Sequence, residues 1–147
     1  MFDPVEFAVL ARQLASGRPD ASLDGVGTSP ECRLRTAVGR AYYALYLSTR
    51  SAIARRHGIP ERRITHGLLY TCLQYARMSG GLRLLGHELQ RLYTLRQKAD
   101  YEVAASARWD ARIGDPKYVD MLAKQAISTA RALEKLDFEP VAALLRS

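Results

Sequence analysis

Arg96 occupies a position where packing alone would favour an apolar side chain. The stretch 82–105 has apolar residues at helical spacing, and Arg96 falls between Leu92 and Ala99 on the same stripe. A buried guanidinium is costly unless it is paired, and Asp100, one helical turn further on, could pair with it. Three interpretations follow: an ion pair that fixes the register of the helices, an arginine held at a phosphate-binding surface, or a side chain whose stem lies along the core while its head reaches solvent.

A group of tyrosines lies in an earlier helical stretch. Tyr42 and Tyr46 are one turn apart, and Tyr43 lies on the neighbouring face with Arg40. Buried tyrosine hydroxyls need hydrogen-bond partners. The partners available by this interpretation are Arg40, Arg96 and Asp100. The same tyrosines also fit an aromatic seam of the core with no further role.

Three other residues could belong to a site for nucleic acid. His66, near the start of a third helix, could serve as a base beside Arg96, although the position also suits a helix-start or surface residue. His87 precedes Arg96 by nine residues, about 13 Å along a helix, so within one chain the two cannot share a phosphate. Trp109, flanked by arginines, could stack on a base or anchor a loop on the bundle.

The residues from Arg50 to Arg63 form the densest basic part of the chain, with Glu61 as their only acid. Such a stretch can bind the phosphates of a nucleic acid, dock an acidic partner, or form a solvated helix end whose cations favour the helix dipole. The candidate phosphate-binding residues here are Arg55, Arg56, Arg62 and Arg63.

Length and composition are those of one globular domain. The chain has 147 residues, 48% of them hydrophobic and 25% charged, with a net charge of +7 that suits phosphate-rich or acidic partners. No apolar stretch approaches the ~20 residues of a membrane span and the start of the chain does not resemble a secretory signal, so we expect a cytoplasmic protein. Cys32 and Cys72 fit small core residues. With no cluster of metal ligands and no glycine-rich phosphate loop, no metal or cofactor is expected.

The elements that position these residues are predicted to be helices. Proline follows a capping residue at Asp3, Ser29 and Asp115, and Gly58 fits a left-handed helix end. The predicted helices cover 5–16, 30–56, 64–78, 82–105 and 116–136, with a last turn or short helix at 140–145. The sequence therefore predicts an all-α fold, an antiparallel up-and-down bundle of four to five helices. We expect one domain over 1–147 with its core over 5–136.

Two segments of the sequence resemble a known family. Residues 35–46 (RTAVGRAYYALY) and 92–101 (LYTLRQKADY) are similar to the two signature helices of HEPN domains (higher eukaryotes and prokaryotes nucleotide-binding), and the likeness extends over residues 5–136. The resemblance implies a helical bundle that forms a homodimer across the motif-bearing helices. It also implies a metal-independent ribonuclease of a toxin–antitoxin or phage-defence system, in which an Arg and a His four to six residues later, from two protomers, converge on the scissile phosphate.

The chain departs from that pattern because Tyr101, not His, stands at the fifth position after Arg96, and all three histidines precede Arg96. The first hypothesis is therefore an RNA- or nucleotide-binding protein with a degenerate ribonuclease motif. Its binding residues would be Arg40, Tyr43, Arg96, Asp100 and the four arginines of the basic stretch. The alternative is a ribonuclease toxin in which Arg96 stabilises the transition state and His66 or Tyr101 transfers protons. A third hypothesis is a non-catalytic assembly subunit. The expected partners are RNA or a nucleotide, a second copy of the chain, and a cognate antitoxin or effector protein.

Overall fold

The computed structural model describes residues 2–17, 29–75, 80–101 and 112–147, and every regular element in these ranges is a helix. The α-helices are α1 (Val5–Ala15), α2 (Pro30–His57), α3 (His66–Tyr75), α4 (Gly80–Tyr101), α5 (Pro116–Ala132) and α6 (Glu139–Arg146), with short 3-10 turns η2 (Glu61–Arg63) and η3 (Leu133–Lys135). The all-α prediction is confirmed, and the short helix expected at 140–145 is present as α6.

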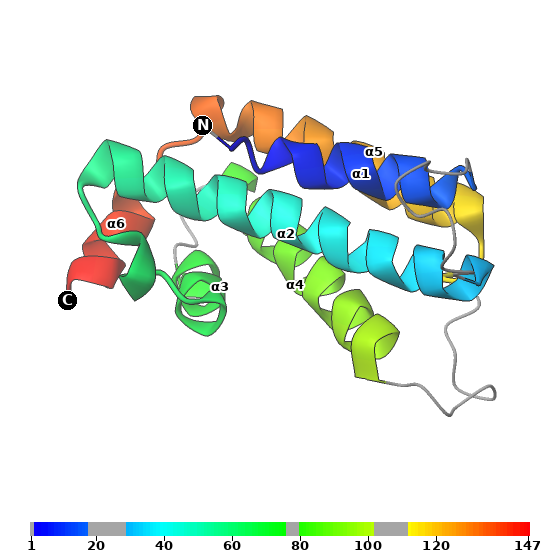
Figure 1. The fold of residues 1–147 in the computed structure, drawn as a ribbon. Coiled ribbons are helices and arrows are strands. Elements are labelled where there is room, and N and C mark those ends of the chain that lie inside the picture. Colours follow the sequence, from blue (N-terminus) through cyan, green and yellow to red (C-terminus); the bar gives the residue numbers. More distant parts are fainter. Residues whose placement is uncertain (1, 18–28, 76–79, 102–111) are drawn as a thin grey trace.

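The four long helices α1, α2, α4 and α5 form an antiparallel bundle (Figure 1). Each runs opposite to the one before it in the chain. Helices α1 and α5 pack against each other and against α2, while α4 packs against α2 from another side. Helices α3 and α6 pack together near the C-terminal end of α2, and α3 also packs against α4. The arrangement therefore brings α2, α3 and α4 together along one side of the molecule.

Residues at the ends of α2 explain why this long helix begins and stops where it does. The Ser29 hydroxyl accepts a hydrogen bond from the backbone N–H of Cys32 (3.1 Å), and Pro30 supplies the fixed φ of a first helical residue. At the other end Gly58 has φ +65°, the left-handed conformation that glycine adopts without strain. Between these ends α2 presents Tyr42, Leu45 and the rest of its buried face to the other helices.

Two predictions about individual elements are wrong. The fifth helix does not reach Leu136 as one α-helix, because the chain tightens into η3 after Ala132. The spacing of Leu133 and Leu136, three residues, fits one turn of a 3-10 helix as well as it fits an α-helix. Cys32 is exposed in the first turn of α2 instead of lying in the core, whereas Cys72 is buried as expected.

The core of the bundle continues into α6 through Phe138 and Val141, both fully buried. The predicted ends of the third and fourth helices at 78 and 105, and Trp109, lie outside the described residues. Among the residues that the structure describes, no helix is both long enough and apolar enough to cross a membrane.

Candidate functional site

The Arg96 side chain lies across the rings of two tyrosines from α2. Its guanidinium carbon is 5.4 Å from the centre of the Tyr42 ring and 5.0 Å from that of Tyr43, both within range of a cation–π interaction. Its Nε donates to Asp100 Oδ2 at 3.1 Å, which is the predicted pair one turn along α4. In the described part of the chain its terminal nitrogens Nη1 and Nη2 have no hydrogen-bond acceptor. The side chain is 20% exposed.

His66 is joined to this group by a hydrogen bond and by ring stacking. Its Nδ1 lies 2.6 Å from the hydroxyl of Tyr42, and its ring stacks on that of Tyr93 with centres 3.9 Å apart and planes inclined by 19°. Since Tyr42 comes from α2, His66 from α3, and Tyr93 and Arg96 from α4, three helices build one site. We call Arg96, Tyr42, Tyr43, His66 and Tyr93 the Arg96 cluster.

Burial and charge decide the protonation states in the Arg96 cluster. Burial raises the pKa of the Tyr42 hydroxyl well above its ordinary value, so this hydroxyl keeps its proton at neutral pH. Burial, and secondly the charge of Arg96, lower the pKa of His66 below 6.5, so its imidazole is neutral there. If the Tyr42 hydroxyl donates to Nδ1, Nε2 of His66 carries the proton. If the hydroxyl accepts, Nε2 has the free lone pair.

The partners of the buried tyrosines differ from those that the sequence suggested. The Tyr42 hydroxyl pairs with His66, and the Tyr46 hydroxyl donates to the backbone carbonyl of Ile64 at 2.8 Å, so neither binds an arginine or Asp100 through its hydroxyl. Ile64 lies just before α3 and His66 is the first residue of α3, so both partners lie in the short segment where α3 begins. This segment is therefore fixed on α2 by two tyrosine hydroxyls one turn apart.

Arg40 lies outside the Arg96 cluster, on the side where Tyr43 faces α1. The guanidinium of Arg40 lies 5.0 Å above the ring of Phe7, and Phe7 is 6.4 Å from the ring of Tyr43. Arg40 is thus held by an aromatic ring from α1, while Arg96 lies against Tyr43 itself. Tyr101 ends α4 with 72% of its surface exposed, five residues beyond Arg96.

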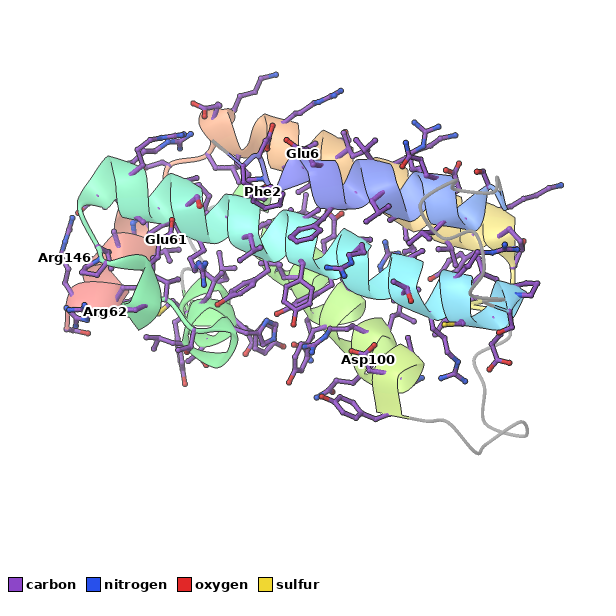
Figure 2. The ribbon with its side chains drawn as sticks, viewed as in Figure 1. Phe2, Glu6, Glu61, Arg62, Asp100 and Arg146 are labelled. Carbon is purple, nitrogen blue, oxygen red and sulfur yellow. The ribbon has the colours of Figure 1, made fainter. Side chains whose placement is uncertain are left out.

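Arg55, Arg56 and Arg62 of the basic stretch lie away from the Arg96 cluster, whereas Arg50 at its start lies 5.6 Å from the centre of the Tyr46 ring, which stacks on Tyr42. Figure 2 shows Arg62 and Asp100 at well-separated places in the molecule, and Arg56 is 14 residues from Tyr42 along α2, about 20 Å. Arg55 and Arg56 both pair with Glu134 (3.2 and 3.1 Å), and Arg56 also donates to the carbonyl of Leu136. These two arginines therefore hold the connection between α5 and α6, while Arg62 and Arg63 are exposed on η2.

Tyr93 and Tyr70 belong with the site but were not among the predicted residues. The rings of Tyr70 and His66 are parallel to within 1°, with centres 6.5 Å apart. Tyr93 is three residues before Arg96, and this spacing could have placed it on the neighbouring face of α4. No group of three or more His, Cys, Asp or Glu side chains that could hold a metal ion occurs among the described residues.

Comparison with protein-family models, with curated proteins and with solved structures gives no match to this chain. The resemblance to HEPN domains therefore stays a prediction, and the geometry of the Arg96 cluster has to support any function on its own.

Proposed function

We propose that the Arg96 cluster binds a phosphate group of RNA or of a nucleotide. One observation carries this proposal. Arg96 is fixed by two tyrosine rings and by a single N–H bond to Asp100, which leaves its terminal N–H groups unused in the described part of the chain. A guanidinium held in this way can donate two parallel hydrogen bonds to phosphate oxygens. The net charge of +7 favours the approach of such an anion.

The family resemblance suggests in which kind of system this phosphate binding takes place. We propose a HEPN-like protein of a toxin–antitoxin or phage-defence system that acts as a homodimer. A cognate antitoxin or effector protein would be its partner. Asp100 orients the guanidinium of Arg96, and the exposed Tyr101 ring is available to stack on or hydrogen-bond the bound nucleotide.

The experiment is a fluorescence-anisotropy titration of labelled RNA at several salt concentrations. Arg96→Ala should weaken binding at least about tenfold and lower the salt slope by about one, because one charged phosphate contact is lost. Arg12→Ala is the matched control, since it removes one positive charge where α1 meets Asp120 of α5. This control should stay within about twofold. An affinity that responds to neither salt nor Arg96→Ala would refute the proposal.

A second candidate, metal-independent RNA cleavage, is favoured by the position of His66. Cleavage without metal needs a base for the 2′-hydroxyl, a cation for the phosphorane and an acid for the leaving oxygen. His66 is neutral near pH 7 and shares Tyr42 with Arg96, although the two lie on different helices. In this candidate His66 would take the place of the His that the motif lacks.

The test is cleavage of a structured RNA pool in EDTA by the wild type, Arg96→Ala, His66→Gln and Tyr101→Phe. Activity lost in the first two variants would establish the cleavage candidate, and loss in Tyr101→Phe would add this residue to the proton transfers. Absence of cleavage by the wild type would remove it and leave the binding proposal standing.

A further inference from the structure

A polar groove runs between α3 and α4 beside the Arg96 cluster. It has a volume of about 360 Å³ and lies where the two helices approach closely, because a Cβ on Gly86 would meet Leu73 Cβ at 3.2 Å. Arg83, His87 and Gln74 on its rim are exposed. The residues that line it are Tyr70, Leu73, Gln74, Arg83, Gly86 and His87, none of which is acidic.

Tyr70 connects this groove to the Arg96 cluster. Its ring lines the groove and lies parallel to the ring of His66. Its hydroxyl oxygen accepts a hydrogen bond from Gln74 Nε2 at 2.5 Å, which fixes the orientation of the ring. His66 in turn stacks on Tyr93 and is hydrogen-bonded to Tyr42, over which Arg96 lies. The rings of Tyr70, His66 and Tyr93 therefore lie between the groove, which Arg83 also lines, and Arg96.

The two arginines are too far apart for one small ligand. Arg83 and Arg96 are 13 residues apart on α4, about 20 Å at 1.5 Å per residue. A free nucleotide can reach one of them, whereas a chain of several nucleotides can reach both. Aromatic rings that run between separated cations are typical of surfaces for single-stranded nucleic acid, where bases stack on the rings while the cations bind the backbone.

Building on the proposed function, we infer that the α3–α4 groove is a second part of the same binding surface and that its ligand is single-stranded RNA. One phosphate binds Arg96, a base lies against Tyr70, and a further phosphate binds Arg83 with His87 beside it. This assigns the site a polynucleotide and not a free nucleotide. The strand must be unpaired, because bases within a duplex cannot stack on Tyr70.

The test compares three labelled ligands by anisotropy: a mononucleotide, a single-stranded octanucleotide, and the same octanucleotide in a duplex. The wild type should bind the single strand most tightly. Arg83→Ala should weaken octanucleotide binding at least about fivefold and lower its salt slope by about one, with no change for the mononucleotide. Tyr70→Ala should weaken it about tenfold. The matched control is Tyr75→Ala, which removes an exposed tyrosine of α3 that does not line the groove.

The outcomes separate this inference from the proposed function. If Arg96→Ala weakens binding of the mononucleotide and of the single-stranded octanucleotide while Arg83→Ala and Tyr70→Ala change neither, the groove is refuted and the phosphate site stands. If Arg83→Ala weakens octanucleotide binding but Arg96→Ala has no effect, the proposed phosphate site is refuted instead. Equal affinity for the single strand and the duplex overturns the stacking on Tyr70, and no RNA binding at all overturns both.

Discussion

At the scale of the residue, Arg96 is held by contacts that add little to stability. An ion pair four residues apart on a solvent-exposed helix face contributes about 0.3–0.5 kcal/mol. A partly exposed cation–π contact adds about 0.5–1 kcal/mol. Together these contacts orient the guanidinium more than they stabilise the fold. The free energy of unfolding that is lost when Arg96 is replaced therefore distinguishes a binding arginine from an arginine that fixes the register of the bundle.

Arg96→Met keeps the length and apolar stem of the side chain but removes its charge. We expect the free energy of unfolding, measured by urea denaturation, to fall by about 1 kcal/mol or less, with a fall of about 0.5 kcal/mol for Asp100→Asn. Both variants should remain folded while RNA binding is lost in Arg96→Met. A loss of more than about 3 kcal/mol for Arg96→Met would instead support the assembly-subunit hypothesis, in which the pair fixes the helix register.

His66 should titrate below pH 6.5, because burial and then the charge of Arg96 disfavour its cation. In Arg96→Met the pKa should rise but stay below 6.5, since burial is the larger cause and remains. NMR titration of the imidazole resonances measures this, with His66→Gln to identify the signal. A pKa that does not move in Arg96→Met would mean that the two side chains are not close in solution.

The depressed pKa of His66 also sets the sign of its effect on stability. Between its folded pKa and 6.5 the unfolded chain binds more protons at this position, so the free energy of unfolding falls as pH drops through that window. Above 6.5 this contribution is fully retained. The free energy of unfolding of the wild type minus that of His66→Gln should therefore decrease as pH is lowered below 6.5.

At the scale of the element, two glycines within helices should respond oppositely to alanine. A Cβ on Gly39 of α2 would lie 4.0 Å from Arg96 Cγ, an ordinary contact, so Gly39→Ala should raise the free energy of unfolding by about 0.5–1 kcal/mol through helix propensity. A Cβ on Gly86 would meet the buried Leu73 at 3.2 Å and force α3 and α4 apart. Overpacking of this kind costs about 1–3 kcal/mol, so Gly86→Ala should destabilise.

Thermal and urea denaturation check this pair of variants, each serving as the control for the other. Gly86→Ala should also weaken octanucleotide binding, because Gly86 lines the α3–α4 groove, while Gly39→Ala should not. Equal stabilisation by both alanines would show that α3 and α4 are not held in close contact in solution.

Glu88 lies where α4 contacts α5, and its effect on the free energy of unfolding changes with pH in the opposite direction to that of His66. Burial raises the pKa of this carboxyl above 4.5, although a hydrogen bond from Thr129 (2.7 Å) and the charge of Arg91 act against the shift. Its other oxygen, Oε1, is buried without a hydrogen-bond partner in the described part of the chain. The folded state therefore binds the proton more tightly, and stability is lost as pH rises from 4.5 through the folded pKa.

Glu88→Gln keeps an oxygen for Thr129 and cannot ionise. Its free energy of unfolding relative to the wild type should increase as pH rises from 4 to 7, and urea denaturation at several pH values measures the difference. Asp120→Asn is an instructive contrast, because its hydrogen bonds from Arg12 and Lys124 outweigh burial and lower the pKa of Asp120. The free energy of unfolding of Asp120→Asn relative to the wild type should change in the other direction and at lower pH, rising as pH falls from 3.8 through the folded pKa of Asp120. A Glu88→Gln difference that is independent of pH would mean that this carboxyl is solvated.

Local signals in the sequence were sufficient for most helices and for one contact of the site. Ser29 before Pro30 and Gly58 after His57 fix the ends of α2 through bonds within a few residues. Likewise the pair of Arg96 and Asp100 needs only the geometry of one helix. Contacts between helices could not be found in this way. The pairing of Tyr42 with His66 depends on where the start of α3 lies on α2, and hydrophobic periodicity does not encode that placement.

At the scale of the whole molecule, the site differs from the arrangement that the family resemblance implies. In that arrangement an Arg and a His from two protomers share the scissile phosphate. Here Arg96 and His66 both contact Tyr42 of their own chain. The groove that Arg83 lines lies between α3 and α4, the helices that carry His66 and Arg96. If the Arg96 cluster and the α3–α4 groove bind RNA as proposed, each chain of a dimer carries its own Arg96, His66 and Arg83.

Mixing two impaired variants tests whether the site belongs to one chain. Arg96→Ala and Arg83→Ala are unfolded together and refolded, so that any subunits can exchange, and octanucleotide binding is measured on the mixture. If Arg96 and Arg83 of the same chain bind one RNA strand, every site in the mixture lacks one arginine. Binding then stays at the level of the two separate variants. If one strand instead binds Arg96 of one protomer and Arg83 of the other, a mixed dimer contains one intact site, and part of the wild-type affinity returns. We expect no recovery, because the rings of Tyr70, His66 and Tyr93 lie between the groove and Arg96 within a single chain.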